Sequence, residues 1–136
     1  MLKCLVLPNA KAPTKKFTGD AGWDLYAYRK YMIQPFERVV IQTGIKVSCP
    51  ENIYFRIADK SGVATKKGLH VLAGVVDSTY RGEVKVLVIN FTKRPVMIQR
   101  HEPIAQMIPT FISQDPLYLV NSLEETQRAE TGGINR

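Results

Sequence analysis

Hydrophobic and polar residues alternate along much of the chain with the period of a β-strand. The clearest stretch runs from Arg38 to Cys49, where every second residue from Val39 onward shares one face and Val40 is the exception. Because successive side chains of a strand point to opposite sides of its sheet, this period predicts a half-buried strand. The strand is expected to end before Pro50.

Other short apolar segments predict a series of further strands. Residues 83–91 are dense in valine and isoleucine and predict a buried strand. More strands are expected at residues 53–59, 96–99, 104–112 and 117–120. Turns containing Gly or Pro separate these segments, and short strands at this spacing predict an all-β sandwich or barrel.

One short helix is predicted, at residues 61–67. Ser61 is expected to cap its start and Gly68 to end it. Residues 124–129 would also permit a helix, but their place beside the C-terminus favours a mobile tail. The pattern therefore predicts one β domain over residues 1–123 and a tail over residues 124–136.

The composition excludes several classes of protein. Of the 136 residues, 45% are hydrophobic and 23% are charged, which is typical of a globular domain rather than a disordered or collagen-like chain. The apolar runs are only a few residues long, whereas a membrane helix needs about 20. Pro8 interrupts the N-terminal segment too early for a secretory signal. We therefore expect a soluble intracellular protein without membrane contacts.

The positions of the cysteines and histidines, and the net charge, limit which metals and partners the protein is expected to bind. Two Cys and two His lie far apart, without the spacing of a zinc site or of a disulfide framework. The net charge of +7 favours anionic partners. Because the Lys and Arg residues are dispersed rather than gathered in a stripe or run, direct nucleic-acid binding is not expected.

Two segments combine glycine with charged residues. In residues 19–27, Asp24 lies in a strand-like pattern, where its carboxylate could bind metal-held water or pair with an arginine; an exposed Asp after a turn is the alternative. In residues 59–68, Lys60 and Ser61 stand where the helix begins and could cradle an anion with backbone N–H groups. The alternative there is a capped turn with solvated lysines.

A third segment, residues 73–83, predicts a hairpin with Asp77 near its neck. A carboxylate held in this way can take a proton from water. Gly74 would let a ligand approach the backbone closely. An ordinary hairpin with an Asp at its turn is the alternative.

The fourth and fifth segments are shorter. Gln106 interrupts an apolar strand pattern, so its amide is expected either in a buried hydrogen-bond network or against a ligand. Near the C-terminus, Arg128 with Gly132 and Gly133 could wrap a phosphate, and a frayed terminus is the alternative.

In their order and spacing, these five segments resemble the five motifs of the trimeric dUTP pyrophosphatases, or dUTPases. The matching stretches are AGWDLYA, DKSGVA, GVVDSTYRGEV, PIAQM and R-x-x-T-G-G, and together they run from Thr18 to Gly133. The resemblance implies a jelly-roll-like β domain that forms a homotrimer, with each active site drawing on all three subunits. It also implies that the tail over residues 124–136 holds a truncated fifth motif.

The resemblance also implies a reaction: Mg²⁺-dependent hydrolysis of dUTP to dUMP and pyrophosphate. Asp77 would activate the water that attacks the α-phosphorus, while Mg²⁺ is bound to the triphosphate. Asp24 would act indirectly, through metal-bound water or by ordering a neighbouring basic residue. The activity limits uracil incorporation into DNA and supplies dUMP for thymidylate synthesis. The cytoplasm or nucleus is the expected compartment, within a host cell if the source is viral.

The substrate-binding residues are implied in the same way. The ring of Tyr80 would lie under the deoxyribose and leave no space for a 2′-hydroxyl group. Backbone groups of three residues would pair with uracil: Ala73, Gly74 and Val75. The phosphate chain would contact Lys60, Ser61, Gly62, Gln106, Arg128, Gly132 and Gly133.

Two departures from the family pattern keep an alternative open. Lys60 replaces the usual Arg, so a point charge replaces a bidentate fork. After Gly133 the chain reads Ile134, Asn135 and Arg136, where the family has an aromatic residue and a further Gly-Ser/Thr segment. A weakly active or inactive nucleotide-binding regulator with the dUTPase fold is therefore the main alternative. A deaminase relative that acts on dCTP is a third.

Overall fold

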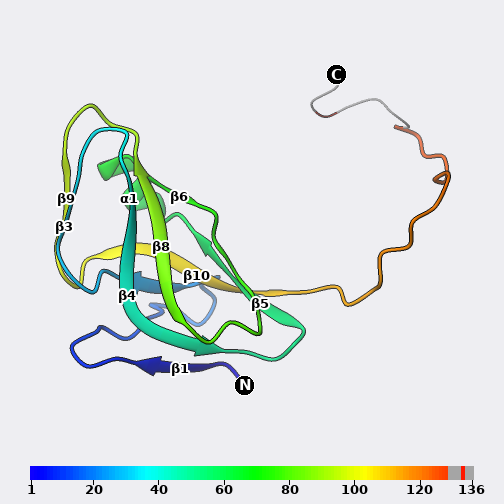
Figure 1. Cartoon of the computed structure of the whole chain (residues 1–136), viewed down its shortest axis with the longest axis horizontal. Helices are drawn as coiled ribbons and strands as arrows, with labels where there is room; N and C mark the ends of the chain where they lie inside the picture. The colour runs from blue at the N-terminus through cyan, green and yellow to red at the C-terminus, as the bar shows by residue number, and fades with distance from the viewer. Residues whose placement is uncertain (129–132, 134–136) are drawn as a thin grey trace.

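Strands make up most of the secondary structure in the computed structural model, which describes residues 1–128 and 133 (Figure 1). The strands are β1 (Lys3–Val6), β2 (Trp23–Tyr26), β3 (Tyr31–Ile33), β4 (Arg38–Ser48), β5 (Ile53–Ala58), β6 (Leu69–Leu72), β7 (Val75–Val76), β8 (Glu83–Asn90), β9 (Val96–Ile98) and β10 (Pro103–Phe111). One helix, α1 (Ser61–Lys67), follows β5.

The strands form two four-stranded sheets with antiparallel pairing. One has the order β1-β4-β8-β6, and the other has the order β2-β10-β5-β7. Strands β3 and β9 form a separate two-stranded ribbon. Consecutive strands repeatedly change sheet, as in a jelly roll. The predicted all-β architecture is confirmed, and the strands expected in β4, β5, β9 and β10 each agree with the structure to within two residues at either end.

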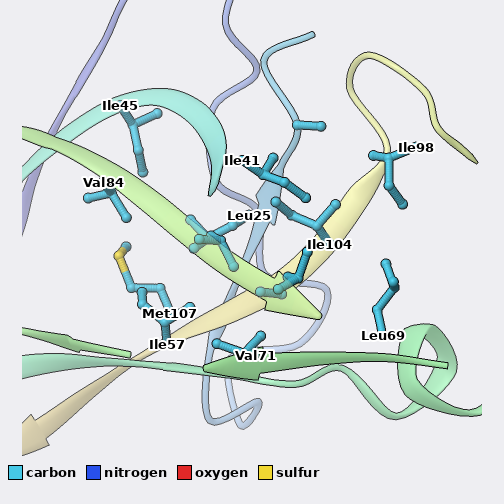
Figure 2. Close-up of a cluster of buried hydrophobic side chains, with 14 of the residues drawn as sticks. Leu25, Ile41, Ile45, Ile57, Leu69, Val71, Val84, Ile98, Ile104 and Met107 are labelled. Atoms are coloured by element: carbon cyan, nitrogen blue, oxygen red, sulfur yellow. The ribbon is translucent and has the colours of Figure 1, made fainter. Parts of the chain in front are cut away.

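The core lies between the two four-stranded sheets. Figure 2 shows side chains from both sheets meeting there, among them Ile41 of β4, Val84 of β8, Ile57 of β5 and Met107 of β10. Strand β8 was expected to be buried, but its residues alternate between buried and more exposed, with Lys85 on the exposed face. The reason is that β8 covers the core with one face only, while its other face forms the outside of the sheet.

The start of α1 differs from the prediction. Lys60, not Ser61, occupies the N-cap position, and no side chain caps the helix. Ser61 is instead the first helical residue. The predicted end is confirmed, because Gly68 adopts the left-handed conformation with φ of 66°.

The strand expected at residues 117–120 is wrong for the isolated chain. Beyond β10 the backbone runs away from the sheets (Figure 1), so no neighbouring strand of this chain can pair with it. Leu117 and Leu119 are consequently about nine-tenths exposed. Since β10 ends at Phe111, the domain boundary at residue 123 and the tail beyond it stay predictions. Within the described part of the chain, no helix has the length and apolarity to cross a membrane.

Asn90, at the end of β8, is a fully buried polar residue that joins three segments. Its Nδ2 donates to the carbonyl oxygens of Ile33, at 3.0 Å, and Arg94, at 2.8 Å. Its Oδ1 accepts from the backbone N–H of Thr92 at 2.9 Å and from the Thr92 hydroxyl at 2.7 Å. All the hydrogen-bonding capacity of this amide is therefore used to tie β3 and the 91–95 turn to β8.

Replacing Asn90 by alanine is expected to lower the free energy of unfolding by about 2–3 kcal/mol, because several buried polar groups lose their partner. Urea denaturation should show a lower midpoint with an unchanged m-value. Lys93→Ala, an exposed change in the same turn, serves as the control and should stay within about 0.5 kcal/mol of the parent. Equal midpoints for the two variants would contradict this account.

Candidate functional site

The register of three strands brings the first, second and fourth sequence segments together. Gln106 of β10 lies opposite Asp24 of β2 on one side and opposite Ala58 of β5 on the other. Directly opposite residues of an antiparallel pair share a face of the sheet. Lys60 follows Ala58 by two residues. The carboxylate, the amide and the ammonium group therefore meet at one end of β5, although they are far apart in sequence.

Lys60 and Asp24 form an ion pair at this end of the sheet. The Lys60 Nζ lies 2.5 Å from the Asp24 Oδ1, and both side chains are about three-tenths exposed. Solvent screens a pair of this kind, so its contribution to stability is small. Its main consequence is positional, since Asp24 holds the ammonium group of Lys60 beside the start of α1.

The amide of Gln106 belongs to a network. Its Nε2 donates to the backbone carbonyl of Asp59 at 2.9 Å. Gly22 is buried against the other side of the same amide, and a Cβ atom at residue 22 would lie 2.8 Å from the Gln106 Oε1 and 2.9 Å from the Ile108 Cγ1. Of the two possibilities left open by the sequence, the structure shows the network; contact with a ligand stays a prediction.

Ser61 and Gly62 lie next to Lys60 on the first turn of α1. Both residues are exposed, and a Cβ atom at Gly62 would have no heavy atom within 4 Å. The first N–H groups of a helix have no partner within the helix. An ammonium group, a hydroxyl group and open backbone donors thus gather where the sequence predicted an anion cradle.

A second region surrounds Asp77 and Tyr80. The exposed carboxylate and the half-exposed phenol ring line a hollow of about 210 Å³. The Tyr80 backbone N–H donates to the Asp77 carbonyl at 3.1 Å, and the Tyr80 hydroxyl donates to the Glu83 carbonyl at 2.9 Å. These bonds fix a tight turn that presents both side chains to the same space.

The predicted hairpin over residues 73–83 is wrong. Strand β7 pairs with β5, whereas β8 pairs with β4 and β6 in the other sheet. The segment is a corner that leads the chain from one sheet to the other. A hairpin and a sheet-to-sheet corner have the same turn residues, and only the partner strands distinguish them.

Gly74, in this corner, lies directly against the backbone of β5. Gly74 has φ of 103°, and a Cβ atom there would lie 2.6 Å from the carbonyl oxygen of Ile57. The Gly74 carbonyl accepts from the Ile57 N–H at 2.7 Å. Strand β5 thus makes a close backbone approach at Gly74, and the approach of a ligand there stays a prediction. Ala73, which also has a positive φ, and the exposed Val75 flank it.

Within one chain, the two regions lie toward opposite ends of β5. Val76 pairs with Phe55, and Asp77 continues from it in one direction while Lys60 lies five residues beyond Phe55 in the other. At about 3.3 Å per residue, these six positions correspond to roughly 15–20 Å. A carboxylate and a phosphate cradle at this separation cannot both touch the same phosphate group.

The fifth segment is only partly described. Arg128 and Gly133 are exposed, and Gly132 lies outside the described residues. The chain thus reaches Arg128 well beyond the end of β10. Its predicted contact with phosphate stays a prediction.

Metal ligands and reactive thiols are scarce. Among residues 1–128 and 133, no three His, Cys, Asp or Glu side chains are grouped closely enough to hold a metal ion. Cys4 is exposed by surface area, but the atoms packed around its thiol desolvate it in part and raise its pKa.

A sequence model of dUTPase matches residues 8–134, which is nearly the whole chain. The chain belongs to the dUTPase family. The mouse deoxyuridine 5'-triphosphate nucleotidohydrolase is 38% identical over 124 residues, which cover 91% of this chain and 76% of the mouse protein. The enzyme of the same name from vaccinia virus strain Copenhagen is 41% identical over 124 residues, covering 91% of this chain and 84% of the viral protein.

Solved structures show the same dUTPase fold. A variant of the dUTPase from staphylococcal phage 80alpha has a TM-score of 0.90 at 24% identity, covering 100% of this chain and 98% of that chain. A variant dUTPase from phage phi11 of S. aureus has a TM-score of 0.85 at 24% identity, covering 92% and 99%. The resemblance to the dUTPases that the five sequence segments indicated is confirmed.

Sequence reasoning gave no role to two residues that the structure places beside the candidate phosphate region. Asp59 precedes Lys60 and accepts hydrogen bonds from Gln106 and from β6, and His70 lies against the Asp59 carboxylate. The sequence signal that could have identified them was a carboxylate before the predicted helix and a histidine after it. Their pairing was not visible, because eleven positions separate them in sequence.

Gly22→Ala is expected to displace the amide of Gln106 and to lower the free energy of unfolding by about 1–3 kcal/mol, since an extra methyl group must fit into filled space. Thermal unfolding measures the stability, and the side-chain amide signals of Gln106 in an NMR spectrum report its displacement. Gly19→Ala is the matched control, because a Cβ atom there meets nothing within 4 Å. Unshifted Gln106 signals in the Gly22 variant would contradict the packing argument.

Proposed function

We propose that this chain hydrolyses dUTP to dUMP and pyrophosphate. Membership of the dUTPase family supports the proposal, as do the mouse and vaccinia virus relatives, which are named deoxyuridine 5'-triphosphate nucleotidohydrolases and are 38% and 41% identical to this chain. The observation on which it chiefly rests is the hollow that Asp77 and Tyr80 share. It combines a carboxylate and an aromatic ring, the two groups needed to activate water beside a nucleoside.

Asp77 is the proposed catalytic base. Its carboxylate takes a proton from a water molecule whose oxygen forms a bond to the α-phosphorus. The bond from that phosphorus to the bridging oxygen breaks, and pyrophosphate leaves with the electron pair. Phosphoryl transfer of this kind depends on positioning and charge neutralisation more than on covalent chemistry. The exposure of Asp77 supports the role, because substrate water can reach it.

The phosphate chain is assigned to the region around the start of α1. Lys60 supplies positive charge, and Ser61 and Gly62 supply hydroxyl and backbone donors. Gln106 contributes the amide hydrogen that does not bond to Asp59. The tail residues of the fifth segment would complete the contacts: Arg128, Gly132 and Gly133.

Magnesium is proposed as the cofactor, and the residues present fit an ion that arrives with the substrate. Mg²⁺ in nucleotide sites is bound by phosphate oxygens, water and one or two carboxylates rather than by an all-protein cage. Asp24 would contact it through water. A phage phi11 dUTPase variant is described with a structural Mg(II) ion. When bound, the ion neutralises phosphate charge.

Recognition of the base and sugar is assigned to the corner between β7 and β8. The backbone of Ala73, Gly74 and Val75 would pair with the uracil edge, and Tyr80 would pack against the deoxyribose. The hydrogen bond from the Tyr80 hydroxyl to the Glu83 carbonyl holds the ring in place. The 2′-hydroxyl group of a ribonucleotide would therefore clash with the Tyr80 ring. Rejection by a clash discriminates more strongly than added attraction does.

We further propose that active sites form between subunits of a homotrimer. The separation of Asp77 from Lys60 along β5 supports this, since one chain cannot bring both to the same phosphate group. The exposed leucines beyond β10 support it as well, because a second chain would bury them. The substrate dUTP occurs inside cells, so an intracellular location is part of the proposal.

Asp77→Asn is expected to abolish the base and to lower kcat for dUTP by about 10²–10⁴-fold, while the KM changes little. Pyrophosphate release with Mg²⁺ measures the rate, and dCTP, dTTP and UTP test selectivity. Slow or absent turnover by the unmodified chain that still binds dUTP would favour the regulatory alternative. Unchanged turnover in Asp77→Asn would exclude Asp77 as the base.

Mixing two inactive variants tests the shared site. Asp77→Asn retains the phosphate region, and the double variant Ser61→Ala with Gln106→Ala retains Asp77. If each site combines both regions from different subunits, an equimolar mixture refolded together should regain about a quarter of the unmodified activity. The two variants refolded separately and then combined without exchange provide the control. No recovery at any ratio would place both regions of the site in one chain.

A further inference from the structure

Asp59 makes three hydrogen bonds that connect separate parts of the proposed phosphate site. Its carbonyl oxygen accepts from the Gln106 Nε2 at 2.9 Å. Its carboxylate Oδ1 accepts from the Val71 backbone N–H at 2.7 Å, and its Oδ2 lies 2.5 Å from the His70 Nδ1. One residue between β5 and α1 therefore contacts both β6 and β10.

These contacts close the loop that presents the phosphate-binding groups. The loop leaves β5 at Asp59, forms α1 and enters β6 at residue 69. The bonds from Asp59 to His70 and Val71 join its two ends. Lys60 and Ser61 follow Asp59 directly, so a change in the backbone of Asp59 would move both of them and the Gln106 amide together.

His70 is itself held in place from its other side. Its ring stacks on that of Phe91, with 6.2 Å between the centroids and 30° between the planes. The Phe91 backbone N–H donates to the Gly68 carbonyl at 3.0 Å. The contact with Phe91 therefore holds the His70 ring in the position from which it bonds to Asp59, although half of the His70 side chain is exposed.

We propose that Asp59 and His70 are positioning residues for the phosphate site: the pair closes the loop at its base and thereby sets where Lys60, Ser61 and Gln106 meet the phosphate chain. The inference rests on the proposed function of this site. Neither side chain needs to touch the substrate. The partly exposed hydrogen bond between the two side chains contributes little to global stability, whereas a displacement of about 1 Å in a reacting group can lower a rate by about 100-fold.

Three variants separate the hydrogen bond from packing. His70→Leu removes the N–H donor while an apolar side chain stays against Phe91. His70→Asn returns an N–H donor close to the position of the Nδ1. Asp59→Ala removes both carboxylate bonds. His101→Asn is the matched control, because the ring of this second histidine bonds to the Asn9 backbone carbonyl, at 2.8 Å, outside the loop.

Ligands with different numbers of phosphates provide the deciding measurement. His70→Leu and Asp59→Ala should weaken binding of the non-hydrolysable α,β-imido analogue of dUTP by about tenfold and lower kcat by a similar factor. Binding of dUMP should stay within about twofold, since the uracil region is assigned to the distant corner. His70→Asn should return both quantities to within about threefold of the unmodified protein, and His101→Asn should change neither.

Hydrogen exchange of residues 60–68 in the ligand-free protein supplies a readout besides activity. Exchange should be faster in His70→Leu and Asp59→Ala, and close to normal in His70→Asn. Equal losses for dUMP and the triphosphate analogue, or unaltered exchange and binding, would overturn the inference. So would a His70→Asn variant that is folded but no better than His70→Leu. Failure of the unmodified chain to hydrolyse dUTP would contradict the proposed function instead, and the exchange result would still decide the role of the pair.

Discussion

The antiparallel pairing of β5 with β10 is the interaction on which the rest of the site depends. Its register sets Gln106 opposite Ala58, and the pairing of β10 with β2 adds Asp24 on the other side. Because side chains alternate between the faces of a sheet, a slip of one residue would turn Gln106 away from both Asp24 and the loop that follows β5. Apolar residues on the core face of these strands, such as Ile57 and Met107, oppose that slip.

Strand β5 also separates the proposed phosphate-binding residues from the proposed catalytic base. At one end β5 leads into Lys60 and Ser61, and near the other end it pairs with β7, which leads to Asp77. Because a strand does not fold back on itself to bring them together, the proposed catalytic site, which uses both, would combine chains. Association and catalysis would then be linked. A subunit alone would hold the phosphate groups or the base in position for a substrate that also needs its neighbour.

The surroundings of Lys60 suit the proposed phosphate region to lysine in place of the arginine that is usual in the family. A guanidinium group orients itself through two parallel hydrogen bonds, whereas an ammonium group on a flexible stem has no preferred direction. In this chain Asp24 directs the ammonium group of Lys60, and the Asp59–His70 pair fixes the backbone that precedes it. Neighbouring carboxylates can thus fix the position of the Lys60 ammonium group, which its flexible side chain does not fix by itself.

The sequence by itself determined the all-β class, the positions of β4, β5, β8, β9 and β10, the end of α1 at Gly68 and the family, because alternation, turn residues and motif spacing are local properties. It did not determine that residues 73–83 turn a corner between sheets, that Lys60 precedes the helix as its cap residue, or that Asp59 meets His70. Each of these depends on which strand pairs with which, and on side chains brought together from distant positions. The tertiary structure decided them, since burying one core between two sheets selects a single register for every strand.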